Sequence, residues 1–404
     1  MRKILLLVSA SMVSAVGLCG FFGVRHAMAK STAEAQTKAV AAAATEFLNS
    51  LSAEQRAKVQ FAFLPQKAAT AAKFARKFQP GGNGMDGKGP GGPPPQGPSG
   101  ASPHVGGPGM GPMGGFVGEK YGESVWSNYP VSDVPRPGLQ LGSLTAAQRD
   151  AAMRLLQLAL SSKGYHKVLE IMGADQVLSA TEGSHFAAGR DVYTIGVFGT
   201  PSMTAPWMLQ FGGHHLGVNV TVDGEHGVMT PTMTGAQPAV YTENGKTVRA
   251  LAAENDKAFA LLDALDNAQK KQAILNYRVD DLVLGPGRAG QVIQPEGLKA
   301  SAMSAHQREL LLDVIEEWAG IVNDAYAAPR MEEIKAGLND TYFAWSGPTT
   351  HEPGRNGSSY YRIQGPKVVI EFSPQGVGGD STMHVHTVYR DPTNDYGVQF
   401  TAGQ

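Results

Sequence analysis

The chain has 404 residues, and its 34 Lys and Arg against 35 Asp and Glu give a formal net charge of -1. Acidic and basic residues are interspersed, and this balance excludes the basic surface that nucleic-acid binding requires. The sequence holds one cysteine, Cys19. A disulfide framework and a thiolate metal site are therefore excluded as well.

The N-terminus has the composition of a secretory signal peptide. Two basic residues precede an apolar run over residues 4–24, and Ala-Met-Ala at 27–29 supplies the small residues of a signal-peptidase site. We therefore expect residues 1–29 to be removed, the mature chain to begin near Lys30, and the protein to be periplasmic or secreted. The alternative is an uncleaved anchor, because the run approaches the roughly 20 apolar residues that span a bilayer.

Removal of the leader would leave a mature chain without cysteine. It would also shift the net charge from -1 to -4, because the leader holds three basic residues and no acidic residue. Lipid attachment at Cys19 is disfavoured, since Leu18 stands where a lipoprotein signal requires a small residue. The later apolar segments are short, so we expect no membrane contact after cleavage.

The body of the chain divides by composition into three regions. Residues 30–78 are rich in alanine and predict a helical N-terminal region, in two helices. Residues 79–118 are dominated by Gly and Pro, which offer too little apolar bulk to offset the entropy of ordering, so we expect a disordered linker. Residues 119–404 then form an α+β region, and its length does not decide between one large domain and two closely packed halves.

Four short motifs mark the starts of helices. Each places a Ser, Thr or Asp three residues before a Gln, the capping-box arrangement in which each side chain bonds the other residue's backbone N–H. They begin at Ser52, Thr145, Asp266 and Ser304. Because the intervals between them are unequal and their flanking sequences differ, we interpret them as independent helix caps rather than as a repeat.

Strand signals are concentrated in the second half of the chain. β-branched and aromatic residues, often alternating and bounded by Gly and Pro, occur over residues 192–198, 215–222, 360–363, 367–372 and 383–390. Strands and helices are partly segregated along the sequence. This pattern predicts an α+β fold, in which an antiparallel or mixed β-sheet is covered by helices.

Histidines are the residues most informative about chemistry. His384 and His386 fall two apart in a strand-like run, so both imidazoles are expected on one face. His214 and His215 are adjacent, so in a strand only one of them can join the same site. Three imidazoles suit zinc, copper or iron better than calcium or magnesium. An ordinary pair of half-buried histidines is the alternative to a metal site.

Charged residues near the histidine pair provide candidate catalytic and ligand-binding groups. Glu371 and Asp391 are candidates for a general base or for a carboxylate that orients a ligand imidazole. Arg390 could bind a carboxylate or phosphate, and Asp395 could line the same pocket. The alternative for residues 389–397 is a well-specified turn, since Asp and Asn bond their own backbone in such sequences.

Two tryptophans next to Gly and Pro residues provide a different candidate site. Trp207 and Trp345 could form a platform for a ligand, or they could be buried rings that anchor irregular loops. The sequence contains no G-x-S-x-G elbow, no dinucleotide-binding motif and no P-loop motif in the expected context. These absences argue against a serine hydrolase and against nucleotide binding.

Several segments between about Gly138 and Gly397 together resemble a bacterial family catalogued as domain of unknown function 3500. The resemblance implies little about activity, because the family name records none, but all four histidines named above lie in its most distinctive segments. These segments include Gln210-Phe-Gly-Gly-His-His-Leu216, Phe343-x-Trp345-x-Gly347, Tyr361-Arg-Ile-x-Gly-Pro366 and His384-x-His386 through Asp391-Pro392 to Asp395-Tyr-Gly397.

Three functional hypotheses follow from the sequence. The first is a metal-binding protein, as a metal-dependent hydrolase or oxidoreductase, with a small-molecule substrate. The second is a non-catalytic periplasmic protein that holds a small polar or carbohydrate-like ligand between Trp207, Trp345 and Arg390. In the third, all the histidines are structural. The hypotheses differ in whether the four histidines converge, and the sequence decides neither oligomeric state nor whether the protein is an enzyme.

Overall fold

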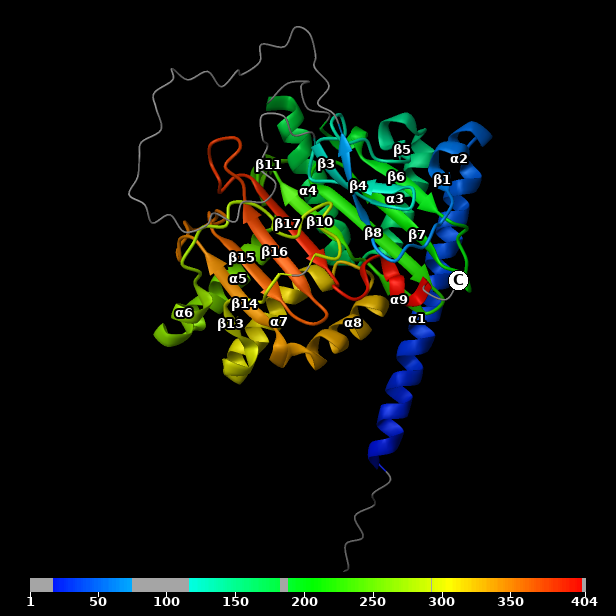
Figure 1. Ribbon diagram of the computed structural model, residues 1–404. Helices are drawn as coiled ribbons and strands as arrows, with labels where there is room; N and C mark the ends of the chain where they lie inside the picture. The colour runs from blue at the N-terminus through cyan, green and yellow to red at the C-terminus, as the bar shows by residue number, and fades with distance from the viewer. Residues whose placement is uncertain (1–16, 75–115, 182–187, 292, 402–404) are drawn as a thin grey trace, which may run out of the picture.

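A single large β-sheet organises the computed structural model, which describes residues 17–74, 116–181, 188–291 and 293–401 (Figure 1). Twelve of the described strands form one mixed sheet, and helices pack against it, which confirms the α+β class. Most of the predicted Gly/Pro linker and most of the predicted leader lie outside the described residues. Among the described helices, none is long and apolar enough to cross a membrane.

The order of the strands across the sheet differs from their order along the chain. The β1–β6 pair is parallel, whereas the other described pairs are antiparallel. All five sequence-predicted strand segments are confirmed. The order is β1 (Gln60–Phe61), β6 (Thr194–Phe198), β7 (Trp207–Gly212), β8 (Leu216–Asp223), β10 (Thr232–Ala236), β17 (Val385–Arg390), β16 (Val369–Pro374), β15 (Tyr360–Gln364), β14 (Tyr342–Ser346) and β13 (Leu298–Lys299), with β5 (Leu139–Gln140) beside β6 and β9 (His226–Val228) beside β8.

The two faces of the sheet are covered differently. The large helices pack their apolar residues with the sheet into the main hydrophobic core. A small sheet and the segment around residue 282 cover the opposite face, where Trp126, Leu282 and Val388 pack together. The large helices are α1 (Gly17–Ser50), α3 (Ala146–Ala159), α4 (Ser162–Thr181), α5 (Ala252–Ala264), α7 (Ala305–Ala319) and α8 (Asp324–Ala336); the small sheet is β2 (Thr70–Phe74), β3 (Phe116–Tyr121) and β4 (Ser124–Trp126). Shorter elements are α2 (Ala53–Val59), α6 (Asn267–Ala273), α9 (Val398–Thr401) and the hairpin β11 (Val240–Glu243) to β12 (Lys246–Arg249).

Strand β17 shows how alternation assigns side chains to these two faces. Thr387 points to the helices, where its hydroxyl accepts a 3.0 Å hydrogen bond from the Trp318 indole N–H. His386 and Val388 flank it in the strand and so point to the other face. All six residues of this strand are buried, so both of its faces are covered, and the polar groups of Thr387, His386 and Arg390 are bonded within the protein.

The four capping boxes are all present, and they come in two equivalent pairs. The side-chain amides of Gln55 and Gln148 bond each other, at 3.0 and 3.2 Å. The amides of Gln269 and Gln307 do the same, at 3.0 and 2.8 Å. In each case the cap of a short helix meets the cap of the long helix that follows it in the chain. The same local arrangement therefore occurs twice.

The rest of the sheet repeats in the same way. After each pair of caps the chain forms two long helices, α3 and α4 or α7 and α8, and then a three-stranded meander, β6–β7–β8 or β14–β15–β16. A further strand, β10 or β17, completes each half, and these two strands pair at the centre of the sheet. The interpretation of the caps as independent of any repeat is thus wrong. Their intervals are unequal because the segment between the two caps is longer in the first half, where it holds the small sheet of β2, β3 and β4.

The N-terminal region is helical over a shorter span than predicted. Helix α2 ends at Val59, and the next residues form β1 and, further on, β2. Phe61 stacks on Phe198 at 5.1 Å between ring centroids, and the strand pairs with β6. Side-chain packing and a place at the sheet edge therefore override the helical propensity that alanine content indicates.

Candidate metal centre

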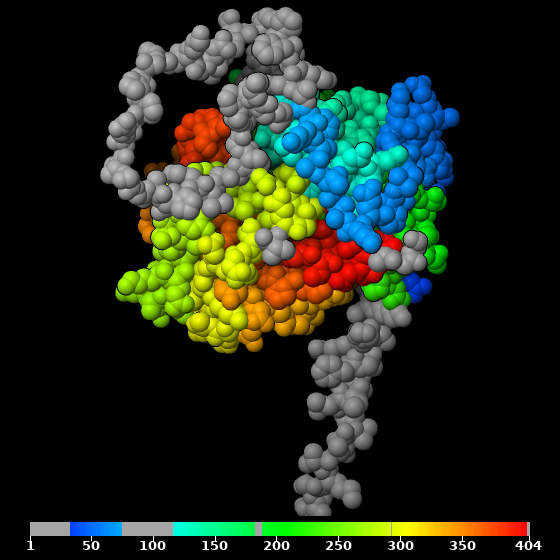
Figure 2. Space-filling view, in the orientation of Figure 1, coloured from blue at the N-terminus to red at the C-terminus, as the bar shows by residue number. Residues whose placement is uncertain are grey.

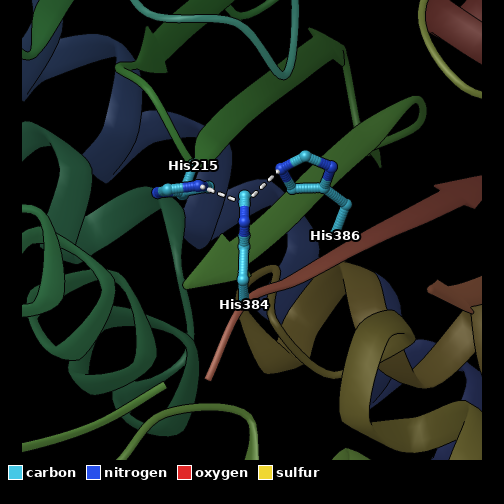
Figure 3. Close-up of side chains that lie close together, drawn as sticks. All are labelled: His215, His384 and His386. Carbon is cyan, nitrogen blue, oxygen red and sulfur yellow. Dashed lines mark hydrogen bonds between the residues drawn. The ribbon is translucent and has the colours of Figure 1, made fainter. Parts of the chain in front are cut away.

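Three histidines converge at one end of the two central strands. The Nε2 atoms of His215 and His384 are 3.3 Å apart, and those of His384 and His386 are 3.1 Å apart. Figure 3 shows the His384 ring between the other two, with the ring edges directed at one another. The side chains are enclosed, since His215 is 0% exposed and each of the others is 6% exposed. Their ligand atoms all lie within 4.8 Å of one another, so this group could hold a metal ion.

Two glycines allow these side chains to meet. Gly213 lies in the turn before His215, and a Cβ there would be 2.9 Å from the Tyr193 ring. Gly235 lies on β10, the strand between β8 and β17, directly opposite His386. A Cβ at Gly235 would sit 3.3 Å from Cδ2 of His215 and 3.4 Å from Cδ2 of His386. The absence of a side chain at Gly235 therefore leaves the space in which the rings approach each other.

Hydrogen bonds on the far side of two rings fix where their protons lie. Nδ1 of His215 is 2.7 Å from Oδ1 of Asp175, and Nδ1 of His384 is 3.0 Å from the carbonyl oxygen of Val377. A carboxylate and a carbonyl accept hydrogen bonds only, so both Nδ1 atoms carry the proton. In a neutral ring the other nitrogen then has a lone pair, which in both cases is the Nε2 atom directed into the cluster.

Two rings of the cluster, those of His384 and His386, are neutral at ordinary pH. Burial, with a contribution from the charge of His215, lowers the pKa of His384 to about 3. Burial likewise lowers the pKa of His386 well below its usual value, and the neighbouring His384 and His215 add to the effect. Neutral imidazole is the form that binds metals. A cation between the rings would also remove the repulsion between the facing lone pairs of His215 and His384.

Two of the three separations between the ligand nitrogens match those expected for a tetrahedral ion. Zn–N bonds of about 2.0–2.1 Å at tetrahedral angles place ligand nitrogens roughly 3.3–3.4 Å apart. The observed separations of 3.3 and 3.1 Å are close to this value. A carboxylate that accepts from the outer nitrogen of a ligand histidine, as Asp175 does, is the usual support of a metal-bound imidazole.

His214 takes a different position from its neighbour. Its ring stacks on that of His215, with 3.7 Å between centroids, and its Nδ1 lies 3.9 Å from Oδ1 of Asp175. His214 thus belongs to a second buried group, with Asp175 and His215, that could hold a metal ion. Burial is the main cause that lowers the pKa of His214 well below its usual value. The structure brings His215, and not His214, to the His384 and His386 pair.

The two carboxylates considered for catalysis are engaged away from the cluster. Glu371 is fully buried and accepts hydrogen bonds from the backbone N–H groups of Val283 and Leu284. The Glu371 side chain lies on the same face of the sheet as the histidines, but its carboxylate binds the loop that contains Val283 and Leu284. Asp391 lies beyond the far end of β17, where it pairs with Arg330 at 2.6 Å. Neither is among the grouped metal-ligand candidates of the described residues.

Arg390 and Asp395 also have structural partners. Arg390 lies four residues after His386, about 13 Å along the strand. All five of its N–H donors bond within the protein, to the carbonyls of Leu284 and Gly285 and to the carboxylates of Glu119 and Asp395. A cavity of about 250 Å³ adjoins both residues. No donor of Arg390 is left for a ligand in it.

The two tryptophans belong to the core. Trp207 and Trp345 are both 0% exposed and lie in the main hydrophobic cluster. Their indole N–H groups donate to the backbone carbonyls of Ser202 and Pro348. These rings anchor loops, which is the alternative that sequence reasoning also considered, and they do not form a ligand platform.

Sequence reasoning missed the residues that support the cluster. Asp175 is on α4 and lies 40 positions before its partner His215, inside a segment whose spacing signals only a helix. Asn128 follows β4, and its amide nitrogen donates to Nδ1 of His386 at 3.3 Å, so a metal bound at Nε2 of His386 would take the place of the ring proton there. Nothing in the sequence around Gly235 indicates that a missing side chain there makes room for the histidine rings. Distant segments supply all three, so local patterns could not identify them.

The role of Arg390 can be tested through its partner Glu119. We expect Glu119→Ala to lower the free energy of unfolding by about 3 kcal/mol, because it leaves a buried guanidinium without its main counter-charge. Glu119 is fully buried, and the exposed Glu123 on the adjacent turn provides the control, Glu123→Ala. Urea denaturation measures both. Equal stability of the two variants would contradict the structural role.

Comparison with known proteins agrees with the sequence resemblance. A family model described as protein of unknown function (DUF3500) matches residues 118–398, a span that includes His214, His215, His384 and His386. Searches of curated proteins and of solved structures find no match. Since the family model covers more than half of the 404 residues, the chain belongs to the DUF3500 family.

Proposed function

We propose that this protein binds one transition-metal ion through Nε2 of His215, His384 and His386. The observation that carries the proposal is the convergence of these three buried nitrogens, with Nε2 of His384 at 3.3 Å from that of His215 and at 3.1 Å from that of His386, and with the protons of the His215 and His384 rings held on the opposite side. Apolar packing alone does not explain why the lone pairs on Nε2 of His215 and His384 point at each other, because two lone pairs repel. A bound cation explains this arrangement.

The donor set favours zinc over the other candidate metals. Three neutral imidazoles suit zinc, copper and iron, and the tetrahedral spacing is the geometry that zinc takes most often. Iron sites of the facial type use two histidines and one carboxylate, and no carboxylate belongs to this triad among the described residues. We therefore expect zinc first and copper second.

A tri-histidine ion has one further coordination position. In catalytic zinc sites this position holds the water that the metal activates, with three protein ligands completing the shell. The proposed centre is therefore compatible with hydrolysis of a small substrate, and its enclosure is compatible with a purely structural ion. The non-catalytic ligand-binding alternative loses support, because Trp207, Trp345 and Arg390 all have their polar groups bonded within the protein. We further propose, from the leader alone, that the ion is bound outside the cytoplasm.

Metal content tests the proposal directly. The chain from Lys30, purified without a histidine tag, is expected to contain about one metal ion per chain by elemental mass spectrometry. His384→Ala/His386→Ala removes two of three ligands and should lose the ion. His306→Ala is the matched control, because His306 is 74% exposed on α7. A parent that stays metal-free after incubation with zinc, copper and iron would overturn the proposal.

The supporting carboxylate makes a second, quantitative prediction. Asp175→Asn should weaken zinc affinity about 10- to 100-fold without changing the number of ions bound, because an amide is a weaker acceptor for Nδ1–H of His215. Competition with a chromophoric chelator measures the affinity. Asp191→Asn, at a residue 71% exposed, is the control. Unchanged affinity in Asp175→Asn would mean that this contact does not support a metal ligand.

A further inference from the structure

The loop between β16 and β17, residues 375–383, lies directly against the histidine cluster. The Val377 carbonyl accepts the hydrogen bond from Nδ1 of His384, and the backbone of Gln375 bonds the carbonyl of His384. The side chain of Val377 is nevertheless 62% exposed. One side of the loop therefore contacts a ligand ring while its other side faces solvent, and the loop projects from the body of the molecule in Figure 2, where it is orange-red.

We propose that this loop is a gate that must open for the metal ion to enter or leave. The inference rests on the proposed metal site. With exposures of 0–6%, the three ligand side chains leave no direct route for a hydrated ion. Among the described residues, this loop contacts the His384 ring through the Val377 carbonyl and is exposed at the Val377 side chain.

The composition of the loop allows it to move. Gly376, Gly378 and Gly379 fall within five residues of one another, and Gly378 and Gly379 have φ values of +95° and +88°, which favour glycine. A Cβ at Gly376 or Gly379 would meet no atom within 4 Å. The base of the loop is fixed, since the Met383 carbonyl accepts from the N–H of Ala239. Motion is thus confined to the tip.

A surface contact holds the tip closed. The Arg355 guanidinium, on the loop between β14 and β15, bonds the carboxylate of Asp380 and the hydroxyl of Thr382. Its ion pair with Asp380 is 39% and 51% exposed at the two side chains, and exposed pairs of this kind are weak. This contact can therefore open without unfolding of the sheet.

Opening of the loop is coupled to the metal ligand. When Val377 moves away, Nδ1 of His384 loses the acceptor that holds its proton, and the ring is no longer fixed with Nε2 toward the ion. The closed loop therefore orients a ligand as well as covering it. Loosening the tip should speed exchange of the ion while leaving the number of bound ions unchanged.

The rate of zinc release tests the gate. Zinc-loaded parent protein is mixed with excess chromophoric chelator in a stopped-flow instrument, and Arg355→Ala and Asp380→Asn are each expected to release zinc about two- to fivefold faster. Arg149→Ala is the matched control, because it breaks an ion pair with Asp191 of similar exposure, 38% and 71%, far from the loop in sequence. It should release zinc at the rate of the parent.

Amide hydrogen exchange of residues 376–382 gives an independent readout on the same proteins. It should be faster in Arg355→Ala and Asp380→Asn than in the parent, and unchanged in the control. A parent that binds zinc, with both variants releasing it at the parent rate, would overturn the gate and leave the metal site intact. A parent that binds no metal would overturn both.

Discussion

The pairing of β10 with β17 is the constraint on which the rest of the structure depends. These strands end the two halves of the repeated arrangement, and their antiparallel ladder joins the halves into one sheet. The Thr234 and Thr387 hydroxyls bond each other across it at 2.7 Å, beside the register pair of Gly235 and His386. A shift of one residue would turn His386 to the helix face. The register therefore sets both the fold and the composition of the histidine cluster.

The cluster lies at the seam between the two halves, and each half contributes to it. His215 and its partner Asp175 come from the first half, whereas His384 comes from the second. Asp175 and the Val377 carbonyl fix the outer nitrogens of two rings, so the inner nitrogens present lone pairs in a buried space. Burial keeps the His384 ring neutral by lowering its pKa. Geometry, hydrogen bonding and desolvation therefore all favour a bound cation.

The sequence predicted those features that depend on local patterns. The capping boxes, the main strands and the common face of His384 and His386 follow from spacing within a few residues, and the structure agrees with them. Features that depend on distant contacts were not predictable in this way. The contact of Asp175 with His215 and the space left at Gly235 arise only when separate segments pack together. Likewise the sequence leaves open whether Trp207 is a ligand platform or a buried ring, because its burial is a property of the assembled core.

The repeat shows how one insertion can conceal a pattern in the sequence. The motifs at Thr145 and Ser304 each follow a glycine-leucine pair, Gly138-Leu139 and Gly297-Leu298, at the same distance. The equivalent caps at Ser52 and Asp266 lie at different distances from them, because the first half holds an extra small sheet. The two halves are shown by the paired caps and by the order of strands, which is the same from either edge of the sheet.

Anomalous diffraction from crystals of the zinc-loaded protein, recorded on both sides of the zinc absorption edge, is the most direct test of the central claim. The account predicts one strong difference peak at about 2.0–2.1 Å from each Nε2 atom of His215, His384 and His386. A well-ordered structure in which the three rings are visible, and in which zinc scatters elsewhere or not at all, would contradict it.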